Sequence, residues 1–507
     1  MDVDAPPLHL HLRRRTRMSG SRLSRLVLAT LTVAAVGVPA AGAPADAVMA
    51  KPNIVVIMVD DMNVSALAHM PSVRSLIANE GTSFDNSVVS YSLCCPSRST
   101  FLTGQYAHNH GVLGNAPPDG GFAKLRAGQT LPVWLGNAGY NTAHVGKFLN
   151  GYGAVNPRQV PPGWAEWYGS VDPSTYSMWG YTLNENGTLR TYGTPAVEDP
   201  ALYQTDVYAD KAADYINRKA PAEQPFFLSF APLAPHGERA VNGVDLSERN
   251  PRPAPRHRGD LDTVTVPKPP NYNEADTSDK PASVRNRPLI TPAAEERIEA
   301  RLKGRLESLL AVDDAVTRII STLRTTGELD NTVVVFTSDN GWMQGEHRIP
   351  SGKIVPYEES LRVPLIIRGP GVPVGKRVST IAANVDLAPT ILDVADATAA
   401  LPMDGRSLLP IANDPGSFAR GIVIETGPKQ NGAWYSGLRA PRWTYVEHST
   451  GERELYDLQQ DPFQLTSVHN DPRYAATRQA LANQLATLRT CSGAPCRQWT
   501  PVPGPQL

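Results

Sequence analysis

Runs of apolar, largely β-branched residues recur along the chain and are its clearest pattern. They occupy residues 53–59, 226–230, 332–337 and 364–368, and residues 141–145 form a shorter candidate. A strand covered on both faces has such a continuous run, whereas a strand with one face in water alternates apolar and polar residues. We therefore expect these segments to be buried strands of a large, mostly parallel central sheet.

Between these runs, apolar residues recur at helical spacing. Residues 71–79 and 131–138 each predict a short helix. A long helix is expected to begin at Thr291-Pro292, because a capping hydroxyl group followed by proline is typical of a helix start. Its core-facing stripe consists of Ile298, Leu302, Leu306, Leu309, Val312, Val316, Ile319 and Leu323. This alternation of strands and helices predicts an α/β fold with helices flanking the sheet.

The pattern changes in two parts of the chain. Residues 238–290 are rich in Pro, Arg, Asp and Asn with little periodicity, and we interpret them as a polar surface insertion that shapes the mouth of a pocket. After residue 405, short turn-separated segments predict a smaller antiparallel sheet with a helix near residues 478–488. These segments are 422–424, 434–438, 443–446 and 454–457. The expected organisation is a leader over 1–47, a main domain over 51–405 and a C-terminal subdomain over 406–507.

The N-terminus has the pattern of a secretory signal peptide. Arginines precede an apolar run over residues 26–38, and small residues follow at 41–43. The run is shorter than the about 20 residues that a membrane-spanning helix needs, which favours a cleaved signal peptide. A membrane anchor is the alternative interpretation. We expect a secreted, extracellular chain without a stable membrane anchor that begins between about Pro44 and Lys51. Met18 is an alternative start to Met1.

Composition argues against nucleic-acid binding and against a fold held together by many disulfides. The net charge of −1 gives no polyanion-binding face, so no nucleic acid is expected to bind. Proline makes up 46 of the 507 residues, or about 9%, against a usual level of about 5%. This excess implies long ordered loops over the core. Four cysteines are too few for a disulfide framework. Export would permit a disulfide between Cys491 and Cys496.

Polar residues follow the predicted strands at the points where these strands end. They are Asp60-Asp61, Lys147, His236 and Asp339-Asn340. Ligands of open α/β sheets bind at the carboxyl ends of the strands. For each acidic pair alone, capping of a strand end or a turn is the alternative interpretation. Together, three carboxylates and an amide oxygen suit a hard cation such as Ca²⁺ or Mg²⁺, and no Cys/His spacing of the zinc type occurs.

The segment Cys94-Cys95-Pro96-Ser97-Arg98 carries a second signal. Adjacent cysteines alone could be small buried residues or part of a disulfide. Cys-x-Pro-Ser-Arg, however, resembles the signature of the type I sulfatases, in which the first cysteine is oxidised to formylglycine. Further segments resemble this family in the same order: 52–61, 146–147, 234–236, 338–341, 345–347, 353, 357–359, 404–408 and 454–458. The resemblance covers nearly the whole expected mature chain and implies an alkaline-phosphatase-like fold, with 51–405 as the catalytic domain.

The resemblance also implies roles for individual residues. One divalent metal, usually calcium in the family, would be bound by Asp60, Asp61, Asp339, Asn340 and the oxidised side chain of Cys94. Arg98 would steady the aldehyde hydrate that serves as nucleophile. Lys147, His236 and Lys353 would contact the sulfate, with His236 or Lys353 as general acid. Formation of the aldehyde would require a formylglycine-generating enzyme during maturation.

One position departs from the family pattern. Many sulfatases have a histidine two residues after the first active-site lysine, and here this position is Leu149. The surrounding pattern is similar to the N-acetylglucosamine-6-sulfatase branch. The base that accepts a proton from the hydrate must therefore be another group, with His236 or a metal-linked carboxylate as hypotheses. Asn150, His108 and His110 are candidates to face the substrate.

The sequence therefore predicts a sulfuric ester hydrolase that acts on an aryl sulfate or on a sulfated sugar such as glucosamine-6-sulfate. The first alternative is a phosphomonoester or phosphodiester hydrolase of the same superfamily, which would more often hold two metals and need further ligands. The second is a non-catalytic, sulfatase-like binding protein. The intact Cys94, Arg98, Lys147, His236 and Lys353 argue against a degenerate site.

Overall fold

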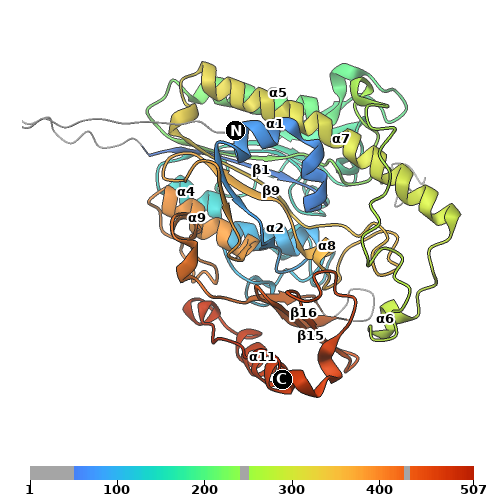
Figure 1. The fold of residues 1–507 in the computed structure, drawn as a ribbon. Helices are drawn as coiled ribbons and strands as arrows, with labels where there is room; N and C mark the ends of the chain where they lie inside the picture. Colours follow the sequence, from blue (N-terminus) through green and yellow to red (C-terminus); the bar gives the residue numbers. More distant parts are fainter. Residues whose placement is uncertain (1–50, 240–249, 428–433, 507) are drawn as a thin grey trace, which may run out of the picture. The chain divides into compact units, whose positions relative to one another are not determined.

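Ten strands of the described residues form one sheet, and its centre is parallel (Figure 1). The computed structural model describes residues 51–239, 250–427 and 434–506, so the expected leader over 1–47 lies outside the described residues. The strand order is β11-β2-β10-β9-β1-β8-β4-β5-β6-β7. The parallel centre consists of β9 (Thr332–Ser338), β1 (Asn53–Val59), β8 (Phe226–Ala231), β4 (Asn141–Gly146) and β5 (Glu166–Ser170). This confirms the expected α/β class.

Both edges of the sheet contain antiparallel pairs, so the sheet as a whole is mixed. At one edge, β10 (Leu365–Arg368) runs antiparallel to β9 and to β2 (Gly81–Phe84), and β11 (Lys376–Val378) runs parallel to β2. At the other edge, β6 (Tyr181–Glu185) and β7 (Thr188–Tyr192) form a hairpin. Its turn residues Asn186 and Gly187 both have positive φ, which favours this tight connection between antiparallel strands.

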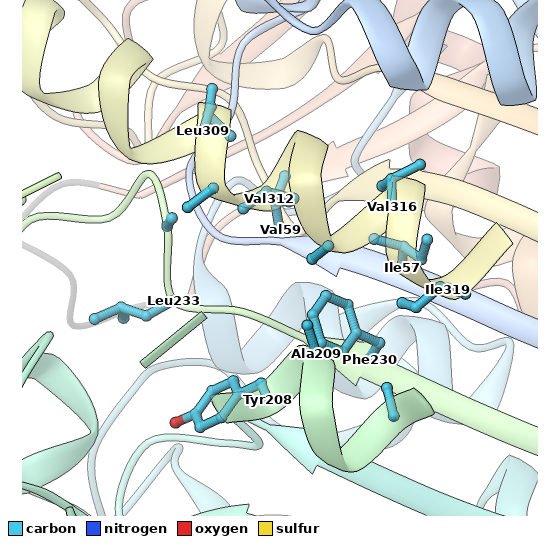
Figure 2. Close-up of a cluster of buried hydrophobic side chains, with 14 of the residues drawn as sticks. Ile57, Val59, Tyr208, Ala209, Phe230, Leu233, Leu309, Val312, Val316 and Ile319 are labelled. Carbon is cyan, nitrogen blue, oxygen red and sulfur yellow. The ribbon is translucent and has the colours of Figure 1, made fainter. Parts of the chain in front are cut away.

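Helices cover both faces of the sheet. On one face, α7 (Pro292–Thr325) packs beside α5 (Gln204–Lys219). Figure 2 shows Val312 and Val316 of α7 with Ile57 of β1 and Phe230 of β8 in this core. The predicted apolar stripe of α7 is buried, and Thr291 caps the helix as expected, since its hydroxyl oxygen accepts a hydrogen bond from the amide of Ala294.

The opposite face carries the helix that begins at the cysteine motif. It is covered by α2 (Cys94–Thr103), α4 (Leu131–Asn137) and α9 (Leu387–Val394). Alternate residues of β1 supply the two cores: Ile54 and Val56 face these helices, whereas Ile57 faces α7. Burial on both faces explains the continuous apolar run in the sequence. The short elements are β3 (Ser87–Val88), β12 (Ala382–Ala383), α1 (Pro71–Val73), α3 (Ala107–His110), α6 (Ala282–Arg285), α8 (Glu358–Leu361) and α10 (Leu409–Asn413).

The C-terminal part contains the predicted antiparallel sheet. Its strands are β13 (Ile422–Glu425), β14 (Tyr435–Arg439), β15 (Trp443–His448) and β16 (Arg453–Asp457), in sequence order. The helix α11 (Ala475–Leu488) packs beside β14 and β15. A disulfide joins Cys491 to Cys496, as the sequence permits. In the described part of the chain, no helix combines the length and apolar character that crossing a bilayer requires.

The polar insertion over 238–290 is not confined to the surface, which corrects the interpretation from composition. Asn271 and Glu274 are buried. Glu274 lies 2.6 Å from Nδ1 of His347 and 3.3 Å from Nζ of Lys280, which is also buried. Buried charges are tolerated when they are paired. Polar composition was therefore misleading, because these polar groups contact each other inside the fold.

Candidate active site

The polar residues predicted to follow strands converge at one edge of the sheet. Strands β9, β1, β8 and β4 are consecutive neighbours and run parallel, so their carboxyl ends lie side by side. Asp339-Asn340, Asp60-Asp61, His236 and Lys147 follow these four ends. Potential ligand atoms of Asp60, Asp61, Cys94 and His236 all lie within 4.8 Å of one another. This buried cluster could hold a metal ion.

Cys94 is the first residue of α2 and lies at the centre of this cluster. Its Sγ is 3.0 Å from Nζ of Lys353, 3.5 Å from Nζ of Lys147 and 3.5 Å from Oδ1 of Asp60. Burial, together with the negative charge of Asp60, raises the pKa of the Cys94 thiol to about 11. The unmodified side chain is therefore protonated near neutral pH and is a poor nucleophile.

The two aspartates after β1 are fully buried and ionised. Burial is the largest single effect and raises their pKa values, but the neighbouring basic groups together lower both to about 2; the chief contributors are Lys147 beside Asp60 and Lys353 beside Asp61. Oδ1 of Asp61 accepts a hydrogen bond of 2.6 Å from the amide of Asn340, whereas its buried Oδ2 has no hydrogen-bond partner. An ionised oxygen in this position is available to a cation.

Arg98 contacts several residues of the cluster through its guanidinium group. Its Nε donates to Oδ2 of Asp339 at 2.8 Å, and its Nη1 donates to the backbone oxygen of Lys147 at 2.9 Å. Its Nη2 lies 3.7 Å from Asp60. Oδ1 of Asp339 accepts from the backbone amide of Asp61 at 3.0 Å. The guanidinium group thus fixes residues from three strand ends relative to α2.

His236 lies at the open side of the cluster. Its Nε2 is 3.6 Å from Oδ2 of Asp61, and its Nδ1 donates to the backbone oxygen of Gly237 at 2.6 Å. Burial lowers the pKa of His236 to about 4, so the ring is neutral near neutral pH. By contrast, burial lowers the pKa values of Lys353 and Lys147, but the nearby acidic groups together raise them, chiefly Asp61 for Lys353 and Asp60 for Lys147, so both lysines are cations.

Sequence reasoning did not identify four neighbours of the site: Arg305, Tyr176, Arg239 and Trp342. Arg305 donates to the backbone oxygens of Asp61 and of Pro235. Burial lowers its pKa to about 10. A sequence signal for Arg305 does exist, because an arginine stands beside Leu306 within the apolar stripe of α7. Tyr176 ends a short 3-10 helix, and Arg239 and Trp342 lie in loops, so no periodicity of the sequence indicates that they approach the site.

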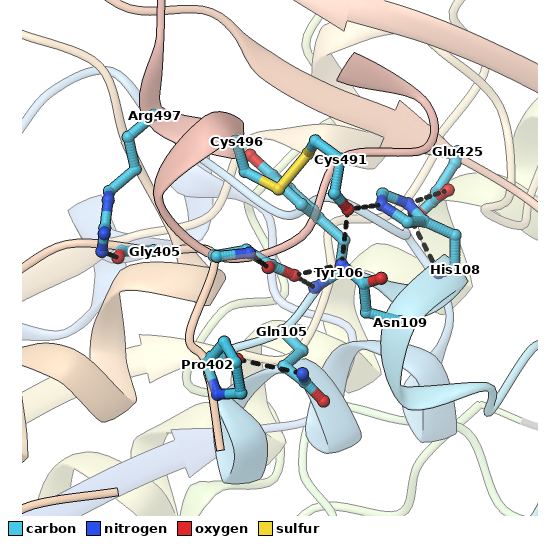
Figure 3. The surroundings of a disulfide bond; sticks show 12 residues. Gln105, Tyr106, His108, Asn109, Pro402, Gly405, Glu425, Cys491, Cys496 and Arg497 are labelled. Atoms are coloured by element: carbon cyan, nitrogen blue, oxygen red, sulfur yellow. Dashed lines mark hydrogen bonds and ion pairs between the residues drawn. A yellow bond between two sulfur atoms is a disulfide. The ribbon is translucent and has the colours of Figure 1, made fainter. Parts of the chain in front are cut away.

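The three candidates for substrate contact near the motif lie elsewhere. Nδ1 of His108 is 3.0 Å from the carboxylate of Glu425, and its Nε2 is 3.0 Å from the backbone oxygen of Cys491, beside the disulfide (Figure 3). His110 is buried against the hydroxyl group of Thr100. Asn150 donates its backbone amide to Sγ of Cys95. None of the three lines the cavity above the cluster, among the described residues.

That cavity has a volume of about 590 Å³ and is lined by several parts of the chain, among them α7 and the segment 349–357. The site contributes His236 and Lys353 to its wall. The insertion contributes Pro281, Ser283, Val284 and Arg287, which supports the expectation that this segment shapes the pocket. The C-terminal sheet contributes Trp434, Tyr435 and His448. A cavity lined by both apolar or aromatic side chains and charged side chains can bind a polar small molecule.

Comparisons with known proteins identify the family. A family model described as "Sulfatase" matches residues 52–397. The chain belongs to the sulfatase family. A second model, "N-sulphoglucosamine sulphohydrolase, C-terminal", matches residues 345–491. The resemblance inferred from the motif order is thereby confirmed, and this sulfatase is an enzyme that hydrolyses sulfate esters.

Individual relatives agree with this assignment. An arylsulfatase of Volvox carteri is 35% identical over 89% of this chain and 76% of its own length. The N-acetylglucosamine-6-sulfatase of Homo sapiens is 31% identical over 88% of this chain and 86% of its own. A solved structure in complex with its substrate D-glucosamine-2-N,6-O-disulfate has a TM-score of 0.72 at 26% identity, covering 86% of this chain and 97% of that one.

Proposed function

We propose that this sulfatase cleaves the sulfate monoester of a sulfated sugar, with formylglycine derived from Cys94 as the nucleophile and one divalent metal. The observation that carries the proposal is the position of Sγ of Cys94, buried within 3.5 Å of Asp60, Lys147 and Lys353. A thiol with a raised pKa is unsuited to attack there. Once hydrated, the aldehyde supplies one hydroxyl group that attacks sulfur and a second whose deprotonation ejects the sulfate.

The residues at the strand ends fit a hard cation. Asp60, Asp61 and Asp339 are buried carboxylates, Asn340 adds an amide oxygen, and Oδ2 of Asp61 has no hydrogen-bond partner. Oxygen donors of this kind suit Ca²⁺, with Mg²⁺ as the alternative ion. When bound, the metal polarises the sulfate and favours ionisation of the nucleophile. These four residues would hold it together with the oxidised side chain of Cys94.

The cations of the site would stabilise the charge that develops during cleavage. Lys147 and Lys353 lie close to Cys94 and are protonated, so they would bind the sulfate oxygens more strongly as negative charge builds. Arg98 would orient the nucleophile through its fixed contacts with Asp339 and Lys147. The neutral ring of His236 would first accept a proton from the hydrate and then pass it to the leaving alcohol, and Lys353 is the alternative acid.

Leu149 is buried in an apolar cluster and has no titratable group. The lysines beside Cys94 are already protonated and so cannot accept a proton. Asp60, 3.5 Å from Sγ, and the neutral ring of His236 are the two candidates for the base among the described neighbours. Asp60 is also a proposed metal ligand. His236 is therefore the better candidate for the base, because it is available to accept the proton before the leaving group departs.

The substrate proposal rests on relatives and on the cavity. The human relative is an N-acetylglucosamine-6-sulfatase, and the structural neighbour binds a sulfated glucosamine. A cavity of about 590 Å³ lies within the range of roughly 300–1,000 Å³ typical of small-molecule sites. An aryl sulfate is the alternative substrate, since the Volvox relative is an arylsulfatase. The leader pattern supports secretion, and maturation would require a formylglycine-generating enzyme.

The test combines mass spectrometry with a hydrolysis screen. Active protein should contain formylglycine at position 94, and it should release sulfate from glucosamine-6-sulfate or 4-nitrophenyl sulfate but not phosphate from phosphate esters. Cys94→Ala should reduce turnover by at least about 10⁴-fold, since the nucleophile is removed. Cys95→Ala is the matched control, because Cys95 packs against Asn150 instead of the cluster. An active protein that contains only the unmodified thiol would contradict the mechanism.

A further inference from the structure

The cavity above the cluster carries more positive charge than one sulfate monoester requires. Its cationic lining residues are Arg239, Arg287, Arg301, Arg305 and Lys353, of which Lys353 forms an ion pair with Asp61. Glu238 is the acidic residue among the described lining residues. Its carboxylate is engaged by Arg252 at 2.7 Å and by the backbone amide of Met178 at 2.9 Å. The electrostatic character of the cavity therefore favours a ligand with more than one negative charge.

Arg239 lines this cavity, is exposed to solvent and lies over an aromatic ring. Its guanidinium carbon lies 4.4 Å from the ring centroid of Tyr176, and its backbone amide donates to the backbone oxygen of Tyr176 at 3.0 Å. A guanidinium group over an aromatic ring is attracted to the ring without using its N–H groups, which can then form hydrogen bonds with a ligand. The edge of the group forms two parallel hydrogen bonds with a sulfate or a carboxylate.

Tyr176 fixes Arg239 next to the residues that contact the scissile sulfate in the proposed reaction. Nζ of Lys147 lies 4.8 Å from the centroid of the same ring, and the ring of His236 lies 5.1 Å away. The phenol oxygen accepts a hydrogen bond of 2.6 Å from Asn150, and the side chain is buried. One rigid ring thus holds three basic side chains together, two at the cluster and one further out in the cavity.

We propose that Arg239 binds a second anionic substituent, a sulfate or a carboxylate, that the substrate carries near the sulfate to be removed. Arg239 is then a specificity-determining residue and Tyr176 a positioning residue. This inference rests on the proposed function and narrows its substrate class to sugars with at least two anionic groups. The shared chemistry is an oxyanion with two oxygens in one plane, which the arginine fork matches.

The test compares substrates that differ in the second group. Initial rates are measured on N-acetylglucosamine-6-sulfate and on glucosamine-2-N,6-O-disulfate, with 4-nitrophenyl sulfate as reference. Arg239→Gln should lower the ratio of kcat/KM for the disulfate to kcat/KM for the monosulfate by about 10- to 100-fold, mainly through KM. Tyr176→Leu should lower the same ratio, whereas Tyr176→Phe, which keeps the ring, should lower it less. A glucuronic acid-containing sulfated disaccharide tests a carboxylate in place of the second sulfate.

The matched control is Arg190→Gln. Arg190 also lies over a tyrosine ring, 5.0 Å from the centroid of Tyr192, and is not among the residues that line the cavity. Equal losses of kcat/KM on the monosulfate, the disulfate and 4-nitrophenyl sulfate in Arg239→Gln would overturn the inference. Arg239 would then act on the scissile sulfate or on the fold. An unchanged ratio would overturn it as well. Failure of the wild-type enzyme to release sulfate from any of the esters would instead contradict the proposed function on which the inference rests.

Discussion

Arg305 shows how a single residue can hold two strand ends of the active site together. It lies on the buried face of α7 and donates to the backbone oxygens of Asp61, after β1, and of Pro235, after β8. The ring of Trp342 lies 5.0 Å from its guanidinium carbon. Buried carbonyl groups without a donor are unfavourable. The hydrogen bonds that Arg305 supplies to them therefore offset the cost of burying its charge.

Replacing Arg305 by Met should therefore destabilise the fold. The substitution keeps much of the volume but leaves two buried carbonyl groups unpaired, so we expect the free energy of unfolding to fall by about 2–4 kcal/mol. Denaturant titration followed by tryptophan fluorescence measures this change. Arg301→Met, one turn earlier on α7 and only half-buried, serves as the control and should lower it by less than about 1 kcal/mol. Equal effects of the two substitutions would contradict the role assigned to Arg305.

At the scale of elements, side-chain contacts attach α5 to the edge of the parallel centre. Glu166 of β5 lies 2.7 Å from Arg218 and 3.1 Å from Lys219, both near the end of α5. Burial alone would raise the pKa of Glu166, but hydrogen bonds from Arg218 and Lys219 outweigh it and lower the pKa to about 2. The carboxylate therefore joins a strand to a helix residue 52 positions further along the chain only while it is ionised.

The stabilisation by Glu166 should depend on pH with a defined sign. A carboxyl group with a lowered pKa in the folded state stabilises the fold above its unfolded pKa, near 4.5, and loses this effect as the pH falls towards 2. Glu166→Gln should thus cost about 1–3 kcal/mol at pH 7 and little at pH 2, as measured by urea unfolding. Asp214→Asn, which removes an exposed partner of the same arginine, should change stability by less than about 0.5 kcal/mol. A loss for Glu166→Gln that is independent of pH would refute the explanation.

The elements that the sequence predicted are those with a continuous apolar run or a long stripe, such as β1, β8, β9 and α7. The hairpin β6–β7 was missed because β7 is largely exposed and has no such run. The helix α5 was missed because its buried face is mostly Ala, Tyr and polar residues, with Val207 and Ile216 as its large aliphatic side chains. The strand-end residues of the site were predictable, since parallel strands bring their ends together. Tyr176 and Arg239 were not, because tertiary packing alone positions these irregular segments.

At the scale of the whole molecule, the C-terminal sheet and the main sheet complete one site. Arg439 of β14 forms an ion pair with Glu358 of α8 at 2.6 Å, and the hydroxyl group of Tyr357 donates to Glu454 of β16 at 3.1 Å. Tyr357 also lines the cavity. The boundary at residue 405 stays a prediction, but the cavity depends on side chains from both sides of it.

Binding of the proposed metal should be measurable as stability of the whole chain. A cation that binds only the folded state stabilises it by RT ln(1 + [L]/Kd), about 2.7 kcal/mol at 100 times Kd. For a chain of this size we expect the Tm to rise by a few °C. The measurement is thermal unfolding of chelator-treated protein with Ca²⁺ or Mg²⁺ added separately. A larger shift with Ca²⁺ would agree with a flexible carboxylate site, because Mg²⁺ requires near-octahedral geometry.

Variants make this measurement specific to the cluster. Asp61→Asn removes the charge of the carboxylate whose Oδ2 has no hydrogen-bond partner, so the shift in Tm should disappear. The control is Asp393→Asn, an exposed aspartate on α9, which should keep the full shift. A shift that survives Asp61→Asn would assign the cation to another part of the protein. An identical Tm with and without both cations would contradict a metal at the ends of β1 and β9. Because the oxidised side chain of Cys94 is itself a proposed ligand, the comparison uses protein in which residue 94 is formylglycine.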